Sequence, residues 1–472
     1  MKILLTGANG YIGKRLLPKL IGLNHQVVCA VRDKSRFAVD ENFRSQVEVI
    51  EIDVLKPETL SNIPFDIDGA YYLIHSMSSS SSFEQLEAES ARNFKAALNK
   101  TKVKHLIYLS GIVNDDQLSK HLQSRKKVED ILATGNYAFT TLRAGIIIGS
   151  GSASFEIVRD LVEKLPVMLT PKWILTKSQP IAIRDILQYL SKSLFSKETY
   201  GKSFDIGGPD VLTYKDMMLQ FAKIRKLSRL IITIPIMTPR LSSYWLYFVT
   251  STSYKLAINL VNSMKVEVIC KPNNLAQLLN ITPTTYRDAI SHAFLKIEQN
   301  EIVSSWKDSM SSSHFDPQLS KYIQVPEFGC YRDVREMKIT DPAYTLSKIW
   351  SIGGDNGWYY ADWLWQIRGI MDKFSGGIGL RRGRTNKTEI QSGDSLDFWR
   401  VLFADKKTAR LLLYAEMKLP GEAWLEFKIK DDTLFQTATF RPKGLAGRLY
   451  WYSVKPFHNL IFKNMMDRIG RQ

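Results

Sequence analysis

Three glycines near the amino terminus have a spacing that suits the phosphates of a dinucleotide. The segment Thr6-Gly7-Ala8-Asn9-Gly10-Tyr11-Ile12-Gly13 directly follows a short apolar run and opens a helical pattern. In such a loop the first glycine permits a tight turn, the second admits a pyrophosphate, and the third lets the helix pack on the strand. The helix amino terminus then faces the anion. We therefore predict that residues 7–13 bind a dinucleotide, the alternative being a glycine-rich turn without a ligand.

Basic side chains follow the second apolar run, where the adenosine ribose of a dinucleotide would lie. NAD-selective sites usually carry an acid there, about 20 residues after the loop, to hold the ribose hydroxyls. This chain has Arg32 at that place, followed by Lys34 and Arg36. Because a guanidinium can bind a 2′-phosphate as a fork, we expect NADP, with NAD as the alternative cofactor. In the other interpretation Arg32 caps a solvated turn and Asp33 binds the ribose.

Two further strand ends carry candidate cofactor contacts. Asp53-Val54 is placed to meet the adenine edge, unless Asp53 merely starts an exposed turn. Ile74-His75 ends the fourth apolar run, and the carboxyl ends of parallel strands are where a nicotinamide would lie. The serine run 78–82 that follows is typical of a loop, which either orders over the cofactor or is an ordinary flexible loop.

A parallel sheet would bring these positions to one edge. Over residues 1–150, short β-branched runs alternate with longer helical patterns, which predicts a doubly wound α/β sheet of the Rossmann type. Residues 151–300 are more helical and would form a substrate-binding annex, so that 1–300 is one domain. We expect strands at Ile3–Leu5, Val27–Val31, Val47–Ile52, Ala70–Ile74, Leu106–Leu109 and Phe139–Leu142, and annex helices over 154–164, 184–195, 214–226, 239–263 and 284–297.

The composition changes after a polar, serine-rich segment over 301–325, which we interpret as a linker. Residues 326–472 hold seven of the ten tryptophans. Alternating runs predict an antiparallel meander, followed by one long helix over the last thirty residues. A curved sheet closed over such a helix is a helix-grip-like α+β fold, which would enclose a cavity for a small apolar substrate or ligand. The runs are Leu396–Phe403, Ala409–Met417, Trp424–Ile429 and Thr433–Phe440.

Charge and cysteine content restrict the classes of partner. The 64 Lys and Arg against 47 Asp and Glu leave a net charge of +17, spread along the chain. Since no nucleic-acid-binding signature accompanies it, we expect no nucleic-acid partner, whereas peripheral contact with an anionic inner membrane is compatible with it. Three widely spaced cysteines favour neither disulfides nor a metal site, so we expect a cytoplasmic protein without a bound metal. The partly apolar segment 241–264 is too polar for a spanning helix and favours a buried or membrane-resting one.

These motifs resemble those of the extended and atypical short-chain dehydrogenase/reductases. Narrower features resemble the bacterial YbjT-like proteins, in which an atypical reductase domain precedes a conserved domain of unknown function. The resemblance covers essentially the whole chain and implies an NAD(P)-dependent oxidoreductase. The shared landmarks are the glycine loop, Asp53-Val54, Tyr108-Leu109-Ser110-Gly111, Leu142-Arg143-Ala144-Gly145, Ile183-Arg184-Asp185 and Phe204-Asp205-Ile206-Gly207-Gly208-Pro209. The narrower ones are His121-Leu122-Gln123-Ser124-Arg125, Gly149–Glu156 and the tryptophan-rich tail.

The sequence departs from that family at the catalytic pair. Active members use Tyr-x-x-x-Lys with a serine on strand five, and the tyrosine passes a proton as hydride moves. Here Ser110 is in place, but alignment on Glu129 puts His121 at the tyrosine position and Arg125 at the lysine position. Arg125 can hold ribose hydroxyls and His121 can donate a proton. Alternatively, both are surface residues of a domain that does not catalyse.

Two functions therefore compete, beside a third, that of a membrane-surface accessory protein, which the basic excess, Trp245 and the basic C-terminal helix suggest. The first is an NADP-dependent oxidoreductase that acts on an apolar carbonyl or a quinone-like substrate. The second is a non-catalytic module that binds or senses a dinucleotide. The missing Tyr-x-x-x-Lys pair favours the second, while Ser110 and the glycine loop support the first.

Overall fold

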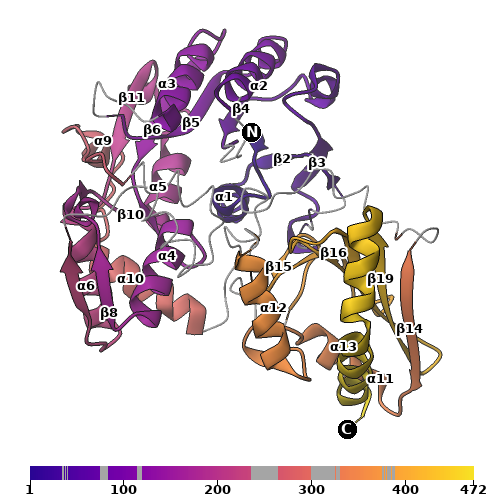
Figure 1. The fold of residues 1–472 in the computed structure, drawn as a ribbon. Helices are drawn as coiled ribbons and strands as arrows, with labels where there is room; N and C mark the ends of the chain where they lie inside the picture. The colour runs from indigo at the N-terminus through magenta and orange to yellow at the C-terminus, as the bar shows by residue number, and fades with distance from the viewer. Residues whose placement is uncertain are drawn as a thin grey trace. The chain divides into compact units, whose positions relative to one another are not determined.

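The computed structural model divides into two compact units, Met1–Ser311 and Ser312–Gln472 (Figure 1), and each is described by itself. The proposed 301–325 linker, apart from residue 325, and the predicted 239–263 helix lie outside the described residues. The structure describes residues 1–34, 37, 39, 41–74, 83–113, 120–234, 264–298, 325, 330–374, 377, 379, 384 and 389–471.

A seven-stranded parallel sheet forms the centre of the N-terminal unit. Its order is β11-β6-β5-β4-β1-β2-β3, so the direction of winding reverses between β1 and β4. All six predicted strands are confirmed, and β11 adds a seventh. A crevice for a ligand is expected at the carboxyl ends of the strands where the order reverses. The strands are β1 (Lys2–Thr6), β2 (Gln26–Val31), β3 (Val47–Glu51), β4 (Gly69–Tyr72), β5 (His105–Gly111), β6 (Ala138–Ala144) and β11 (Lys202–Ile206).

Helices cover both faces of this sheet (Figure 1). Ile3 and Leu5 of β1 belong to the apolar core beneath α1 and α5, whereas Leu4 between them belongs to the core beneath α2 and α3. Because successive side chains are buried on opposite faces, the strands are continuously apolar, as doubly wound sheets require. The helices are α1 (Tyr11–Gly22), α2 (Phe83–Leu98), α3 (Lys120–Leu132) and α5 (Ile183–Ser193).

The annex of the N-terminal unit has a core of its own. Phe155, Phe221 and Phe294, from three helices, pack together with ring centroids 5.2–5.9 Å apart. The predicted helices at 154–164, 214–226 and 284–297 are confirmed in the annex. The helix predicted at 184–195 also forms, but as α5 it packs on the sheet beside α1 instead of in the annex. The annex consists of α4 (Ala153–Lys164), α6 (Tyr214–Ile224), α9 (Leu275–Leu278), α10 (Tyr286–Glu298) and the short strands β7 (Ile147–Ile148), β8 (Val167–Thr170), β9 (Lys177–Ser178), β10 (Ile181–Ala182), β12 (Leu212–Thr213) and β13 (Leu230–Thr233).

The C-terminal unit is a six-stranded antiparallel sheet with a final long helix. The predicted meander and C-terminal helix are confirmed. In addition, the unpredicted strand β14 pairs with β19 over eight residues. An aromatic core that includes Trp358 and Phe398 joins the sheet to its helices. The elements are β14 (Tyr331–Lys338), α11 (Pro342–Trp350), α12 (Asp362–Phe374), β15 (Ser395–Leu396), β16 (Trp399–Asp405), β17 (Arg410–Ala415), β18 (Gly421–Lys430), β19 (Thr433–Pro442) and α13 (Gly444–Gly470).

Candidate active site

The glycine loop turns sharply between β1 and α1. Gly7 has a φ of 67°, in the left-handed region, and the amide of Gly10 donates a hydrogen bond to the Gly7 carbonyl oxygen at 2.9 Å. A Cβ atom on Gly13 would overlap that same carbonyl oxygen and the Cα atom of Ala8. Only glycine at position 13 therefore lets α1 pack this closely on the loop.

The amino terminus of α1 offers backbone donors to a ligand. Gly10 is the N-cap residue, no side-chain hydrogen bond caps the helix, and its first turn contains no acidic residue. Around this terminus Ala8 is buried, Ile12 is half-buried and Asn9 is exposed. Uncapped N–H groups and the helix dipole both favour an anion, so these residues fit a pyrophosphate.

The loops after β1 and β4 are held together at the point where the strand order reverses. The Thr6 hydroxyl donates to the Tyr71 carbonyl oxygen at 2.8 Å and accepts from the Leu73 amide at 3.2 Å. Ile74, which follows, is half-buried. The predicted contact His75 and the serine run 78–82 lie outside the described residues.

The end of β2 presents basic side chains to solvent. Arg32 and Lys34 are exposed, and the Lys34 amide donates to Glu51 Oε2 at 3.3 Å. Asp33 is half-buried, and Arg36 lies outside the described residues. An exposed Arg32 at the carboxyl end of β2 is accessible to a phosphate group.

Asp53 and Val54 have structural contacts at the end of β3. Asp53 Oδ1 accepts a hydrogen bond from the Leu55 amide at 3.1 Å, which stabilises the turn that begins there. Val54 is buried, and its carbonyl oxygen accepts from Asn93 Nδ2 of α2 at 2.9 Å. The Asp53 carboxylate thus has a role in the turn, as the alternative interpretation describes.

Ser110 and Arg125 bring unused polar atoms to the carboxyl end of β5. Ser110 is 4% exposed, and its hydroxyl interacts with the Tyr108 phenol but makes no other hydrogen bond within the described part of the chain. Arg125 Nη1 donates to the Leu109 carbonyl oxygen at 3.4 Å, whereas its buried Nε has no partner among the described residues. His121 lies one helical turn earlier on α3, and its side chain is outside the described residues.

Glu129 clamps α3 to the sheet. Its carboxylate accepts two hydrogen bonds from Arg143 on β6, at 3.0 and 2.6 Å, and one from Ser203 on β11 at 2.8 Å. The side chain of Glu129 is 5% exposed, so this is a desolvated ion pair. Sequence reasoning used Glu129 and Arg143 only as landmarks and missed their pairing, which fixes α3 and therefore Arg125.

Arg15 links the glycine loop to the annex, a contact that sequence reasoning also missed. Its guanidinium lies 4.1 Å from the centre of the Tyr11 ring, and Nη2 donates to the Ser150 carbonyl oxygen at 2.8 Å. Burial raises the pKa of Tyr11 to about 12, although Arg15 opposes the shift. A Cβ atom on Gly149 would lie 2.6 Å from the Tyr11 hydroxyl. The available signal was the four-residue spacing of Tyr11 and Arg15 on one helix.

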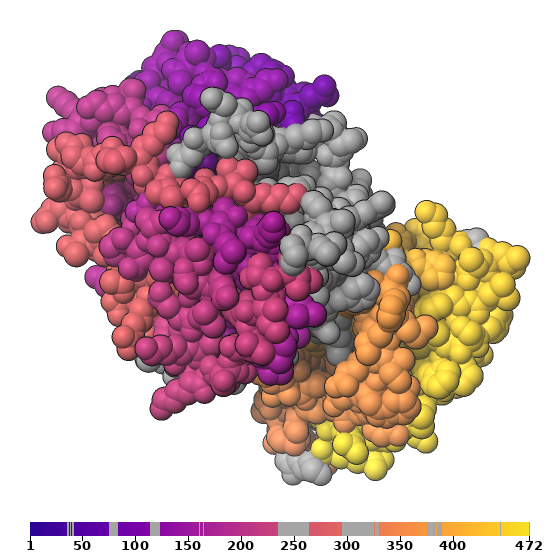
Figure 2. Space-filling view, turned by 60° about the vertical axis from the view of Figure 1, so that its left-hand side comes forward, coloured from indigo at the N-terminus to yellow at the C-terminus, as the bar shows by residue number. Residues whose placement is uncertain are grey.

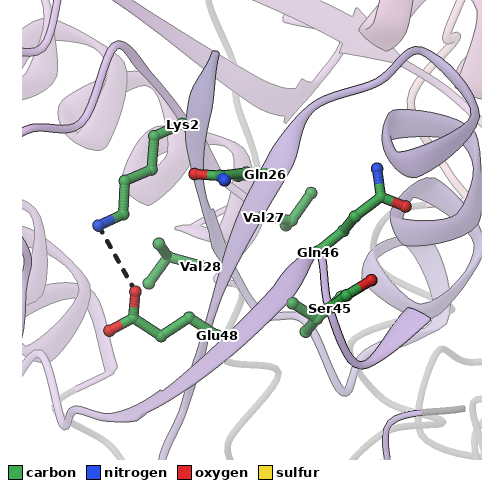
Figure 3. Close-up of a pocket in the computed structure, with 8 residues that line it drawn as sticks. Lys2, Gln26, Val27, Val28, Ser45, Gln46 and Glu48 are labelled. Atoms are coloured by element: carbon green, nitrogen blue, oxygen red, sulfur yellow. Dashed lines mark ion pairs between the residues drawn. The ribbon is translucent and has the colours of Figure 1, made fainter. Parts of the chain in front are cut away.

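A separate hollow of about 190 Å³ lies at the amino ends of the strands, opposite the cofactor crevice (Figure 3). Residues at the start of β1, β2 and β3 line it, and Lys2 Nζ lies 3.5 Å from Glu48 Oε2 across it. Ligands of open α/β sheets bind at the carboxyl ends of the strands, so this hollow is distinct from the cofactor crevice. Its lining consists of Lys2, Gln26, Val27, Val28, Ser45, Gln46, Val47 and Glu48.

The fold and the glycine loop define the N-terminal unit as a nucleotide-binding domain of the Rossmann class. Residues 7–160 match the family described as NAD(P)H-binding, and residues 329–465 match a family described as a protein of unknown function, DUF2867. The chain therefore contains an NAD(P)-binding region and, further along, a DUF2867 region. These two matches confirm the predicted arrangement, in which an atypical reductase-like NAD(P)-binding region precedes a conserved region of unknown function.

Known proteins share parts of this chain at low identity. Divinyl chlorophyllide a 8-vinyl-reductase of Arabidopsis thaliana is 21% identical over 227 residues, which are 44% of this chain and 54% of that protein. The chain thus spans about half the length of this curated relative.

Solved structures show the same fold. A nucleoside-diphosphate-sugar epimerase from Staphylococcus aureus has a TM-score of 0.50 and 16% identity over 61% of this chain and 99% of its own. Triphenylmethane reductase from Citrobacter sp. has a TM-score of 0.51 and 16% identity over 62% of this chain and 100% of its own. Within the part of the chain that the structure describes, no helix has the length and apolar character needed to cross a membrane.

Proposed function

We propose that the N-terminal domain binds NADP(H) and that the protein is an oxidoreductase for an apolar carbonyl or a quinone-like substrate. The observation that carries the proposal is the glycine loop, in which Gly7 and Gly13 let α1 present uncapped amides to a pyrophosphate. The match to the NAD(P)H-binding family and the reductases among proteins of similar sequence or fold support it.

The residues at the end of β5 would orient the reacting groups. When bound, the nicotinamide would supply the hydride. Arg125, held by the Leu109 carbonyl, would donate hydrogen bonds to ribose hydroxyls, and the Ser110 hydroxyl would donate to the substrate carbonyl oxygen. His121, one turn before Arg125, would deliver the proton to that oxygen.

NADP is proposed over NAD because Arg32 is exposed at the end of β2. We expect Arg32→Ala to weaken NADPH binding by about 10-fold or more, the loss of a charge-assisted contact, and to change NADH affinity by less than about 2-fold. Arg44→Ala is the matched control. Arg44 is also exposed, but it precedes β3 and therefore lies at the amino ends of the strands, away from the proposed cofactor site. Equal losses for both nucleotides in Arg32→Ala would refute the assignment.

The proposed apolar substrate class rests on the C-terminal unit. The rings of Trp365 and Trp399 lie 5.1 and 6.0 Å from that of Trp358, and both of their buried indole N–H groups have no partner among the described residues. These rings belong to the buried core of the unit, and an apolar molecule with one hydrogen-bond acceptor would satisfy one of the two N–H groups. Native mass spectrometry of the purified chain tests this by detecting a retained small molecule. Within the part of the chain that the structure describes, Cys29, Cys270 and Cys330 form no disulfide, which is compatible with the cytoplasmic location that we propose.

The second candidate function is a non-catalytic dinucleotide sensor, favoured by the absence of Tyr-x-x-x-Lys on α3. NADPH titration followed by oxidation assays with quinones and aldehydes separates the two. Turnover that falls at least about 10-fold in His121→Ala, with NADPH affinity retained, supports the enzyme. Binding without turnover favours the sensor, and no binding of either nucleotide refutes both.

A further inference from the structure

Two helices of the C-terminal unit carry large apolar side chains on their exposed sides. On α13, Leu445, Leu449 and Tyr452 are 74%, 63% and 60% exposed, and on α12 Trp363 is 61% exposed. Most of them recur every three or four residues, with one five-residue step from Tyr452 to Phe457, so each set lies on one broad side of its helix. We call these residues the α12–α13 surface: Trp363, Ile367, Ile370, Leu445, Leu449, Tyr452, Phe457 and Leu460.

The two helices are neighbours. The guanidinium of Arg368 on α12 lies 5.8 Å from the ring centre of Tyr450 on α13, and Trp365 and Phe462 meet beneath with ring centroids 6.2 Å apart. The inner side of α13 is already used, because Trp451, Phe462 and Met465 are buried. The exposed apolar side chains are therefore additional to those that hold the fold together. Large exposed apolar side chains gathered on two neighbouring helices indicate an interaction site.

The charges on α13 indicate what binds there. Lys443, Arg448, Lys455 and Lys463 are all exposed, and residues 443–466 contain no aspartate or glutamate. Figure 2 shows residues of the last part of the chain, in yellow, over a continuous area of the surface of this unit. Leucines and aromatic rings interleaved with lysine and arginine on one helix are typical of helices that lie in a lipid interface. Nucleic acid would use the charges but would leave the leucines in water.

We propose that the C-terminal unit docks on an anionic lipid bilayer through the α12–α13 surface. The apolar side chains enter the boundary between headgroups and acyl chains, and the four basic residues contact anionic headgroups. This goes beyond the oxidoreductase proposal and does not depend on it, because the surface involves no residue of the cofactor crevice. A membrane-docked protein would meet apolar substrates where they are concentrated.

The test is flotation of the full chain with phosphatidylcholine vesicles that contain or lack phosphatidylserine. We expect binding to the anionic vesicles, weakened by added salt. One basic residue near an anionic surface raises the affinity for the membrane by about 5-fold. The double variant Arg448→Gln/Lys455→Gln should therefore bind the anionic vesicles roughly 25-fold more weakly. The double variant Lys428→Gln/Lys430→Gln, which removes two exposed charges from β18, should bind like the wild type.

A second pair of variants tests the apolar contribution. Leu449→Gln should weaken vesicle binding at least about 3-fold, the effect of withdrawing part of one leucine from the interface. Val334→Gln changes a residue that is 58% exposed on β14 and should have no effect. Unchanged unfolding midpoints would show that all variants fold. The proposal is overturned if wild type does not float with anionic vesicles, if vesicles without phosphatidylserine bind equally, or if sizing shows a dimer that Leu449→Gln dissociates.

Discussion

His105 makes the stability of the N-terminal unit depend on pH. The side chain is fully buried at the start of β5, and its Nδ1 accepts a hydrogen bond from the Phe195 amide at 3.0 Å. Its Nε2 lies 2.9 Å from Thr140 Oγ1. Since the amide can only donate, the proton of the neutral ring is on Nε2, where it reaches the threonine hydroxyl. Burial lowers the pKa of His105 to about 4.

The sign and size of the effect follow from proton linkage. An unfolded histidine titrates near pH 6.5, so below that value the unfolded chain takes up a proton that the folded chain refuses. Stability is therefore complete above about pH 6.5 and is lost as the pH falls toward 4. At about 1.4 kcal/mol per pH unit, the loss between roughly pH 7.5 and 5 is about 2 kcal/mol.

Hydrogen exchange read from β5 and β6 peptides by mass spectrometry measures this loss after correction for intrinsic rates. The matched variant is His105→Asn, whose side-chain oxygen can accept from Phe195 but does not titrate. We expect the opening free energy of the wild type to fall by about 2 kcal/mol from pH 7.5 to 5 and that of the variant to change by less than about 0.5 kcal/mol. Burial also lowers the pKa of His25. Because His25 is present in both proteins, its contribution cancels when their pH dependences are compared. The same slope in both would refute the assignment to His105.

Two substitutions test the glycine loop and the C-terminal core. Gly13→Ala places a Cβ on the Gly7 carbonyl oxygen, so calorimetry should show NADPH affinity reduced more than about 10-fold, whereas an unchanged affinity would contradict the close packing of α1. Arg400→Met removes the guanidinium that donates to the buried Glu416 carboxylate and should cost about 3–5 kcal/mol in urea unfolding followed by tryptophan fluorescence. Adding Glu416→Leu should restore most of that loss, and no recovery would show that packing rather than charge causes it.

Elements with a strong local pattern were predictable, and those defined by distant partners were not. Apart from the edge strand β3, where Glu48 and Glu51 are exposed, the first six strands of the N-terminal sheet are largely apolar because both faces are buried, so their composition reveals them. The missed strand β14 alternates half-buried and exposed residues, with charged side chains in both sets, and it becomes a strand only by pairing with β19, about a hundred residues later in the chain. The missed β11 is similar: its first two residues are exposed, and its partner β6 lies far back in the sequence.

The candidate site divides in the same way. Gly7 and Gly13 act through backbone geometry within one turn, so their spacing carried the information. The Glu129–Arg143–Ser203 clamp joins three elements whose adjacency follows from the strand order and not from any local motif. The sequence therefore predicted residues of the crevice, but it did not reveal the hydrogen bonds that fix α3 against β6 and β11.

The clamp also bears on whether α3 belongs to a working site. It fixes the helix that carries Arg125, whose Nη1 donates to the Leu109 carbonyl oxygen and whose buried Nε has no partner among the described residues. Ser110, the residue after Leu109 on β5, is also buried. Each unpaired polar atom costs about 1–3 kcal/mol, a cost that a ligand with hydroxyl or carbonyl oxygens would remove. Polar side chains on a surface that binds no ligand would be expected to hydrogen-bond with water instead. The arrangement thus supports a bound ribose and carbonyl at the end of β5, and it leaves proton delivery to His121 as the step on which catalysis, as opposed to sensing, depends.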